Sequence, residues 1–133
     1  MGEQEHEAGQ SAERIRLRRV YDPPTPDDGL RILVDRLWPR GLTKEAARVD
    51  LWLRDVAPSN ELRRWYGKDL TKWEEFRSRY LQELAERPEA IEPLLDAARR
   101  GPITLLYGKR DERHNQAVVL KAVLEERLRQ DPA

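Results

Sequence analysis

The stretch of residues 32–41 constrains the fold of this chain most, because a buried strand ends abruptly within it. Ile32, Leu33 and Val34 are consecutive apolar residues, which is typical of a strand buried on both faces. Pro39 cannot donate a hydrogen bond to a strand ladder, so a turn is predicted there. The carboxyl end of this strand therefore presents a carboxylate, an indole and two guanidiniums: Asp35, Arg36, Trp38 and Arg40.

A second buried strand is predicted from Ile103 to Tyr107. Several helical segments separate the two strands, which allows a parallel pairing with a helical crossover. Their carboxyl ends would then lie side by side, at the edge where open α/β sheets usually bind ligands. The residues expected to join the first group at this edge are Lys109, Arg110, Asp111 and Asn115.

The helical segments are recognised by apolar residues that recur every three or four positions. The clearest spans about residues 72–86, and Thr71 followed by Glu74 is interpreted as its capping box. Shorter helices are predicted after Thr43 and after Ser59, two residues that commonly cap helices. Further helices are expected before the second buried strand and from Asn115 to near the end of the chain.

Arginines at positions 14, 16 and 18 alternate with Ile15 and Leu17, which predicts a half-buried strand with a basic outer face. The turn-rich loop that follows, residues 22–29, is shorter than the dozen residues that a parallel crossover usually needs. If the first two strands are neighbours, we therefore expect them to be antiparallel. Tyr21 and Asp22 would then lie at the opposite end of the sheet from Asp35, outside the candidate site.

These patterns predict a single small α/β domain over residues 14–130, preceded by a disordered tail over residues 1–13. Its short central sheet contains at least two buried parallel strands plus an antiparallel edge strand, and helices cover it. The 25 basic and 25 acidic residues balance, which argues against a protein that coats nucleic acid through bulk charge.

The composition excludes several kinds of chemistry. The chain has no cysteine, which excludes disulfides and thiolate sites, and His114 has no second histidine outside the tail with which to build a zinc site. We therefore expect neither a metal nor a cofactor. No apolar run approaches the ~20 residues that span a bilayer, and no signal peptide is evident. A cytoplasmic protein that does not bind membranes is the simplest interpretation.

Residues 34–41, Val-Asp-Arg-Leu-Trp-Pro-Arg-Gly, resemble the signature of the YeaO-like proteins, a bacterial family of unknown function (domain-of-unknown-function family 488). Two further groups, in the right order, are similar to the same family. One is Ala57-Pro58-Ser59 with Glu61, Leu62, Arg63 and Trp65, and the other is residues 104–107 with Asp111, Asn115, Gln116, Ala117 and Leu120. The resemblance covers roughly residues 15–128 and implies no particular activity.

The residues at the predicted strand ends suggest a site for a small anionic ligand that bears a phosphate or a carboxylate. Asp35 or Asp111 is the candidate general base if the protein is an enzyme. The cations and polar groups available to bind the ligand are Arg36, Trp38, Arg40, Lys109, Arg110 and Asn115.

Other interpretations remain open. The same charges can form an ion-pair network that only ties the turns together, and Asp111 or Asn115 can simply cap a helix. A non-catalytic module that binds a nucleotide or nucleic acid, with Trp38 or Tyr107 stacking on a base, is an alternative, as is a protein-interaction domain. The chain lacks both G-x-x-x-x-G-K-[ST] and G-x-G-x-x-G, which disfavours a nucleoside triphosphatase or a dinucleotide fold.

Overall fold

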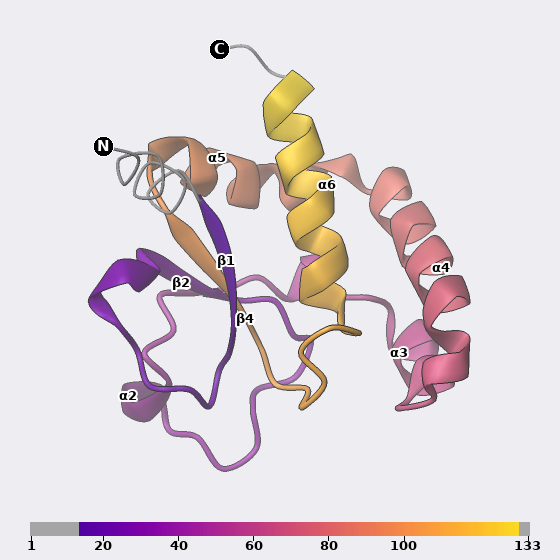
Figure 1. Ribbon diagram of the computed structural model, residues 1–133, viewed down its shortest axis with the longest axis horizontal. Coiled ribbons are helices and arrows are strands. Elements are labelled where there is room, and N and C mark those ends of the chain that lie inside the picture. The colour runs from indigo at the N-terminus through magenta and orange to yellow at the C-terminus, as the bar shows by residue number, and fades with distance from the viewer. Residues whose placement is uncertain (1–13, 131–133) are drawn as a thin grey trace, which may run out of the picture.

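Four strands in the order β1-β4-β2-β3 form the sheet of the computed structural model, which describes residues 14–130 (Figure 1). Every neighbouring pair is parallel. The protein is therefore a small single-domain α/β protein, as the sequence predicted. The tail predicted to be disordered, residues 1–13, lies outside the described residues. The strands are β1 (Ile15–Arg19), β2 (Leu30–Leu33), β3 (Leu51–Trp52) and β4 (Ile103–Tyr107).

The predicted antiparallel edge strand is wrong, because β1 lies at the edge but runs parallel to its neighbour β4. β4 separates β1 from β2, and residues 20–29 connect these two strands. Ten extended residues reach about 33 Å, whereas a five-residue strand is only about 16 Å long. The chain can thus return along the sheet without a crossover helix. As a result, Tyr21 and Asp22 follow the carboxyl end of β1, at the same edge as Asp35.

One face of the sheet is covered by α6 (Gln116–Gln130), which contacts β1 and β4. Helices α4 (Trp73–Glu86) and α5 (Glu92–Arg100) pack against α6, and Figure 1 shows α4 on the outer side of the molecule. The main core lies between the strands and these helices. Its strand residues are Ile15, Ile32, Val34, Ile103, Leu105 and Tyr107. None of the helices within residues 14–130 is long and apolar enough to cross a membrane.

The opposite face of the sheet is covered only by short segments. The helix α2 (Lys44–Ala47) contributes Ala47 to a small cluster with Val20, Leu33 and Leu106. Thr43 caps α2, and Ser59 caps the short helix α3 (Asn60–Tyr66), as the sequence predicted. The remaining short helices are 3₁₀ turns: η1 (Pro26–Asp28), η2 (Arg54–Val56), η3 (Leu70–Lys72) and η4 (Pro88–Ile91).

The predicted capping box at Thr71 is wrong, although α4 itself lies where the sequence placed it. Asp69 supplies the cap one turn earlier, because its Oδ1 accepts hydrogen bonds from the Thr71 amide at 3.0 Å and the Thr71 hydroxyl at 2.6 Å. This geometry forms η3, so the Thr71 side chain acts as a donor. Lys72, the residue before α4, makes no side-chain cap.

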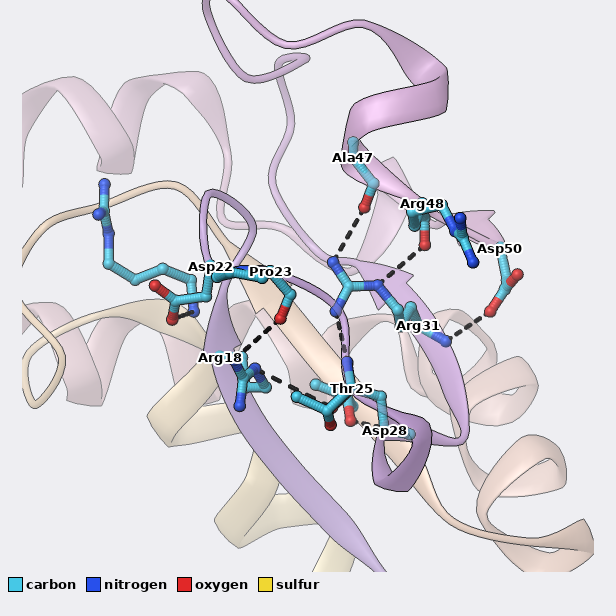
Figure 2. Close-up of polar contacts among 11 residues, drawn as sticks. Arg18, Asp22, Pro23, Thr25, Asp28, Arg31, Ala47, Arg48 and Asp50 are labelled. Atoms are coloured by element: carbon cyan, nitrogen blue, oxygen red, sulfur yellow. Dashed lines mark hydrogen bonds and ion pairs between the residues drawn. The ribbon is translucent and has the colours of Figure 1, made fainter.

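A buried ion pair holds the second face together (Figure 2). The Asp28 and Arg31 side chains are only 2% and 5% exposed, and Arg31 Nη1 lies 2.6 Å from Asp28 Oδ2. Arg31 also donates from Nε to the Arg48 carbonyl at 2.9 Å and from Nη2 to the Ala47 carbonyl at 2.9 Å. One guanidinium thus ties η1 and α2 to β2.

The Asp28 carboxylate is hydrogen-bonded from both sides. Desolvation raises the pKa of Asp28, but hydrogen bonds from Thr25 and Arg31 outweigh it and hold that pKa below its usual value of 3.8. The Thr104 hydroxyl in β4 donates to the Asp28 main-chain carbonyl at 2.7 Å. Asp28 therefore links the loop before β2 to the centre of the sheet.

We predict that Asp28→Ala lowers the free energy of unfolding by about 3–5 kcal/mol, because it leaves the Arg31 guanidinium buried without its carboxylate. Urea denaturation measures this loss. Glu75→Ala is the control, since it removes an exposed ion pair with Arg79 and should cost no more than about 1 kcal/mol. A similar small loss for both variants would contradict the structural role of the buried pair.

Gly29 is predicted to tolerate no side chain, because its φ is +64° and an added Cβ would lie 2.1 Å from the Pro102 carbonyl oxygen. Gly41→Ala is the matched control, since φ there is +81° but no atom lies within 4 Å of the added Cβ. Gly41→Ala should cost about 1–2 kcal/mol of stability from backbone strain alone. Gly29→Ala should cost clearly more in the same urea titration, and equal losses would refute the clash.

Candidate functional site

The carboxyl ends of β1, β4 and β2 meet at a cavity of about 380 Å³. Tyr21 reaches it from the end of β1, Gly108 and Lys109 from the end of β4, and Asp35 from the end of β2. The α3 region and the following loop form another wall. The cavity is lined by Tyr21, Asp35, Arg36, Leu37, Trp38, Pro39, Arg40, Ala57, Pro58, Arg63, Tyr66, Gly67, Lys68, Phe76, Gly108, Lys109 and Gln116.

Asp35 joins three elements at the floor of this cavity. Its Oδ2 accepts a hydrogen bond from the Gly108 amide at 2.9 Å, and its Oδ1 accepts one from Nε2 of Gln116, the first residue of α6. A Cβ at position 108 would lie 3.0 Å from Asp35 Oδ2, so glycine gives the carboxylate room to approach the backbone. The carboxylate thereby connects the end of β2 to the end of β4 and to the start of α6.

Burial raises the pKa of Asp35 from 3.8 to about 6. The Gly108 amide, Gln116 and the positive charges of Arg63 and Lys109 counteract part of this rise. Asp35 is therefore ionised at neutral pH but takes up a proton in mildly acidic solution. A raised carboxyl pKa in a cleft is a common property of functional sites.

Three of the cavity cations already have partners. Arg36 donates from Nε to the Pro58 carbonyl at 3.1 Å and from Nη2 to the Ala57 carbonyl at 3.2 Å. Lys109 Nζ donates to the Gly67 carbonyl at 2.7 Å and lies 3.9 Å from the centre of the Tyr66 ring, and burial lowers the pKa of Lys109.

Arg63 is the third of these cations. It donates from Nη2 to Asn60 at 3.1 Å, while its buried Nε has no partner among residues 14–130. Arg63 therefore keeps one unused donor in the wall of the cavity.

Arg40 and Lys68 are exposed, and their side chains make no hydrogen bond or ion pair with the residues that the structure describes. The Arg40 main-chain carbonyl accepts a hydrogen bond from the Tyr21 hydroxyl at 2.8 Å, which fixes the turn that carries Arg40. Both cations therefore line the cavity without a side-chain partner among residues 14–130, and Arg40 does so from an anchored turn.

A second cavity of about 960 Å³ adjoins the first. Its lining adds Arg110 and Asp111, two residues predicted for the site, to Arg40 and Lys109. The structure therefore brings Arg36, Trp38, Arg40, Lys109 and Asp35 to the first cavity, and places Arg110 and Asp111 only at the second. Both cavities share Tyr21, Arg40, Lys68, Gly108 and Lys109.

Asp111 and Asn115 serve the backbone around the start of α6. Asp111 Oδ1 accepts hydrogen bonds from the amides of Arg113 at 2.9 Å and His114 at 3.0 Å, and these bonds hold the pKa of Asp111 below its usual value of 3.8. Asn115 is fully buried, and its Oδ1 accepts a hydrogen bond from the Ala117 amide at 2.9 Å. Asn115 lines neither cavity, and Asp111 is a weaker candidate base than Asp35.

The aromatic residues proposed to stack on a base are held by the fold. Trp38 donates from Nε1 to the Leu42 carbonyl at 2.7 Å, and its ring centre lies 5.4 Å from that of Trp52. Tyr107 is 3% exposed. Tyr21, which is 40% exposed, is the accessible aromatic ring at the shared edge of the two cavities.

The lining residues that sequence reasoning did not assign to the site include Tyr21, Arg63, Lys68 and Gln116. Tyr21 was excluded by the wrong strand direction, since a parallel β1 brings it to the Asp35 edge. Arg63 and Lys68 belong to α3 and its following loop, and no local pattern shows that this segment packs over the strand ends. Within residues 14–130, no group of three or more His, Asp or Glu residues is placed to hold a metal ion.

Comparisons with known proteins agree on a family without an assigned activity. Residues 14–133 match the family model described as the inactive DUF488-N3 subclade. The uncharacterised protein YeaO of Escherichia coli is 43% identical over 106 residues, which cover 80% of this chain and 92% of YeaO. The uncharacterised protein Rv3073c of Mycobacterium tuberculosis is 42% identical over 111 residues, which cover 84% of this chain and 93% of Rv3073c. No solved structure is significantly similar to the chain.

The raised pKa of Asp35 predicts how stability changes with pH. The folded protein holds this proton more tightly than the unfolded chain, so the contribution is fully present below about pH 3.8 and is lost as the pH rises through about 6. The expected loss is about 3 kcal/mol, at about 1.4 kcal/mol per pH unit. Urea denaturation across this range should show this loss as a growing difference in stability between wild type and Asp35→Asn, which shares the contributions of all other carboxyls.

A titration followed by carboxyl carbon NMR tests the same point directly. The Asp35 signal should have its midpoint near pH 6. Lys109→Met should move that midpoint upward, because it removes a positive charge that stabilises the carboxylate. A wild-type midpoint near 3.8 would contradict the burial of Asp35.

Proposed function

We propose that this chain, which belongs to the DUF488 family of YeaO-like proteins, binds a small organic anion in the cavity at the carboxyl ends of its strands. The observation that carries the proposal is the charge of the lining. Five cationic side chains face the cavity with a single carboxylate, Asp35: Arg36, Arg40, Arg63, Lys68 and Lys109.

The fold supports this proposal independently of the charge count. Ligands of open α/β sheets usually bind outside the carboxyl ends of the strands, and all four strands here run in the same direction. Arg40 and Lys68 have no partner among the described residues, so a ligand can bind them without breaking existing bonds. An ion-pair network that only tied the turns together would have given these two cations carboxylate partners.

We propose binding and assign no reaction. The matching family model describes its subclade as inactive, which agrees with a site that retains a ligand without converting it. Both Asp35 carboxylate oxygens already accept hydrogen bonds, one from Gly108 and one from Gln116, so the carboxylate acts first as a structural connection. A cytoplasmic location remains a prediction from the sequence.

The alternative nucleic-acid role has less support from the positions of the basic residues. Arg14 donates to the Ala98 carbonyl at 2.5 Å and Arg18 to the Pro23 carbonyl at 3.1 Å, so both serve the fold. Two of the three arginines at positions 14, 16 and 18 are thus engaged, so this segment does not offer the continuous free stripe that backbone phosphates require.

Arg40→Ala is predicted to weaken anion binding without unfolding the protein. A ligand present at ~100 times its dissociation constant should stabilise the wild type by about 2.7 kcal/mol, and about half of this gain should disappear in the variant if its affinity falls about tenfold. The stability of the free protein should change by less than about 1 kcal/mol, since the side chain is exposed. Thermal unfolding with phosphate, sulfate and nucleotide monophosphates measures both quantities.

Arg100→Ala is the matched control, because this exposed arginine lies near Pro102 and Leu30, at the amino ends of the strands. It should retain the full ligand-dependent gain. If no anion shifts the wild-type transition beyond a general salt effect, or if both variants lose the gain equally, the proposed site is refuted. The interaction-domain alternative would then be favoured.

A further inference from the structure

The two adjoining cavities differ in the chemistry of their walls. Residues that line both cavities lie where the two meet, and three of these shared residues are cationic: Arg40, Lys68 and Lys109. We call the first, smaller cavity the inner one and the second, larger cavity the outer one. Asp35 lines only the inner cavity and Asp111 only the outer one. The junction, defined by the residues that line both cavities, therefore has three cationic residues and no carboxylate, although the charges of Asp111 and Asp35 act on Lys109.

The two cationic side chains that line only the inner cavity, Arg36 and Arg63, already form hydrogen bonds within the protein. Arg36 donates to the carbonyls of residues 57 and 58. Arg63 donates to Asn60, and its charge acts on Asp35, whose pKa it lowers. The cations with unused donors at the junction are Arg40 and Lys68, whose side chains have no partner among residues 14–130, and Lys109, whose Nζ makes one hydrogen bond and keeps two further N–H donors.

The rest of the inner wall is mainly apolar. Pro39, Ala57, Pro58 and Phe76 are buried residues that line the inner cavity and not the outer one. Leu37 lines the inner cavity as well, and it is 58% exposed although it is a large apolar side chain. Such a surface gains free energy when an apolar group replaces water against it.

We propose that the ligand of this site is a phosphate monoester with a small apolar or aromatic body, which enters the inner cavity while the phosphate stays at the junction between Arg40, Lys68 and Lys109. This inference rests on the proposed function and specifies its ligand class and orientation. A phosphate carries close to two charges and three acceptor oxygens, so it suits a site lined by three cations better than a carboxylate, which carries one charge.

The size of the inner cavity limits the apolar body. Its volume of about 380 Å³ is near the lower end of the ~300–1,000 Å³ typical of ligand sites. A body of one or two rings fits this volume, whereas a dinucleotide does not. Tyr21, anchored through its hydroxyl to the Arg40 carbonyl, borders the junction and can contact the ester group.

Isothermal titration calorimetry with phenyl phosphate and inorganic phosphate tests the ligand class on the full chain. Phenyl phosphate should bind wild type at least about tenfold more tightly, the gain expected from burying a ring. Arg40→Ala should weaken both ligands about tenfold. If the two ligands bind equally and both are weakened by Arg40→Ala, the anion site stands and the apolar body is refuted.

Two matched leucine variants test the orientation. Leu37→Asn changes the inner cavity and Leu70→Asn changes only the outer one, and both leucines are more than half exposed, at 58% and 51%. Leu37→Asn should weaken phenyl phosphate at least threefold and leave inorganic phosphate unchanged, whereas Leu70→Asn should change neither.

Two results would overturn the inference. A selective loss in Leu70→Asn would place the body in the outer cavity and contradict the orientation. No binding of either ligand to wild type would refute the anion site and the inference together.

Discussion

The fold depends on the buried ion pair between Asp28 and Arg31, because the second face of the sheet has no layer of long helices to cover it. Instead, a turn-rich loop and the short helix α2 lie on that face, and the Arg31 guanidinium binds both through Asp28 and two main-chain carbonyls. Breaking a buried pair leaves an uncompensated charge, so each partner strongly constrains where the other segment can lie. Polar bonds here supplement a small apolar cluster, whereas α6 covers the other face mainly through apolar packing.

The position of this loop also determines which residues meet at the candidate site. Because the loop that contains Asp28 returns along the sheet, β1 and β2 run in the same direction, and Tyr21 emerges at the same edge as Asp35. Asp35 then connects this edge to Gly108 and to α6. The carboxylate neutralises part of the surrounding positive charge, while Arg40 and Lys68, which have no side-chain partner among residues 14–130, also line the cavity. Asp35 therefore influences both the packing of the strand ends and the distribution of charge at this edge of the sheet.

Much of this edge could be predicted from local sequence. Asp35 and Lys109 directly follow buried strands, and parallel pairing of those strands brings the two residues together. Asn115 was expected in the site because it follows β4, as Lys109 does. Its side chain instead points into the protein and caps α6. Arg63 and Lys68 could not be predicted, because their position depends on how α3 packs against strands that are distant in sequence. The neighbouring residues in the sequence do not distinguish an asparagine that caps a helix from one that binds a ligand.

Local sequence was sufficient to predict β1, β2 and β4, the helices α2 to α6 and the family, since apolar periodicity, capping residues and signature motifs are properties of short segments. It also determined that cations would gather at the carboxyl end of a buried strand. It did not identify β3 as a strand. The tertiary structure was needed to establish the direction of β1, the pairing of β3 with β2 and the two adjoining cavities at the strand ends. These features depend on distances between segments far apart in the chain, and loop length alone does not set those distances, because ten extended residues can return along a strand without a helix.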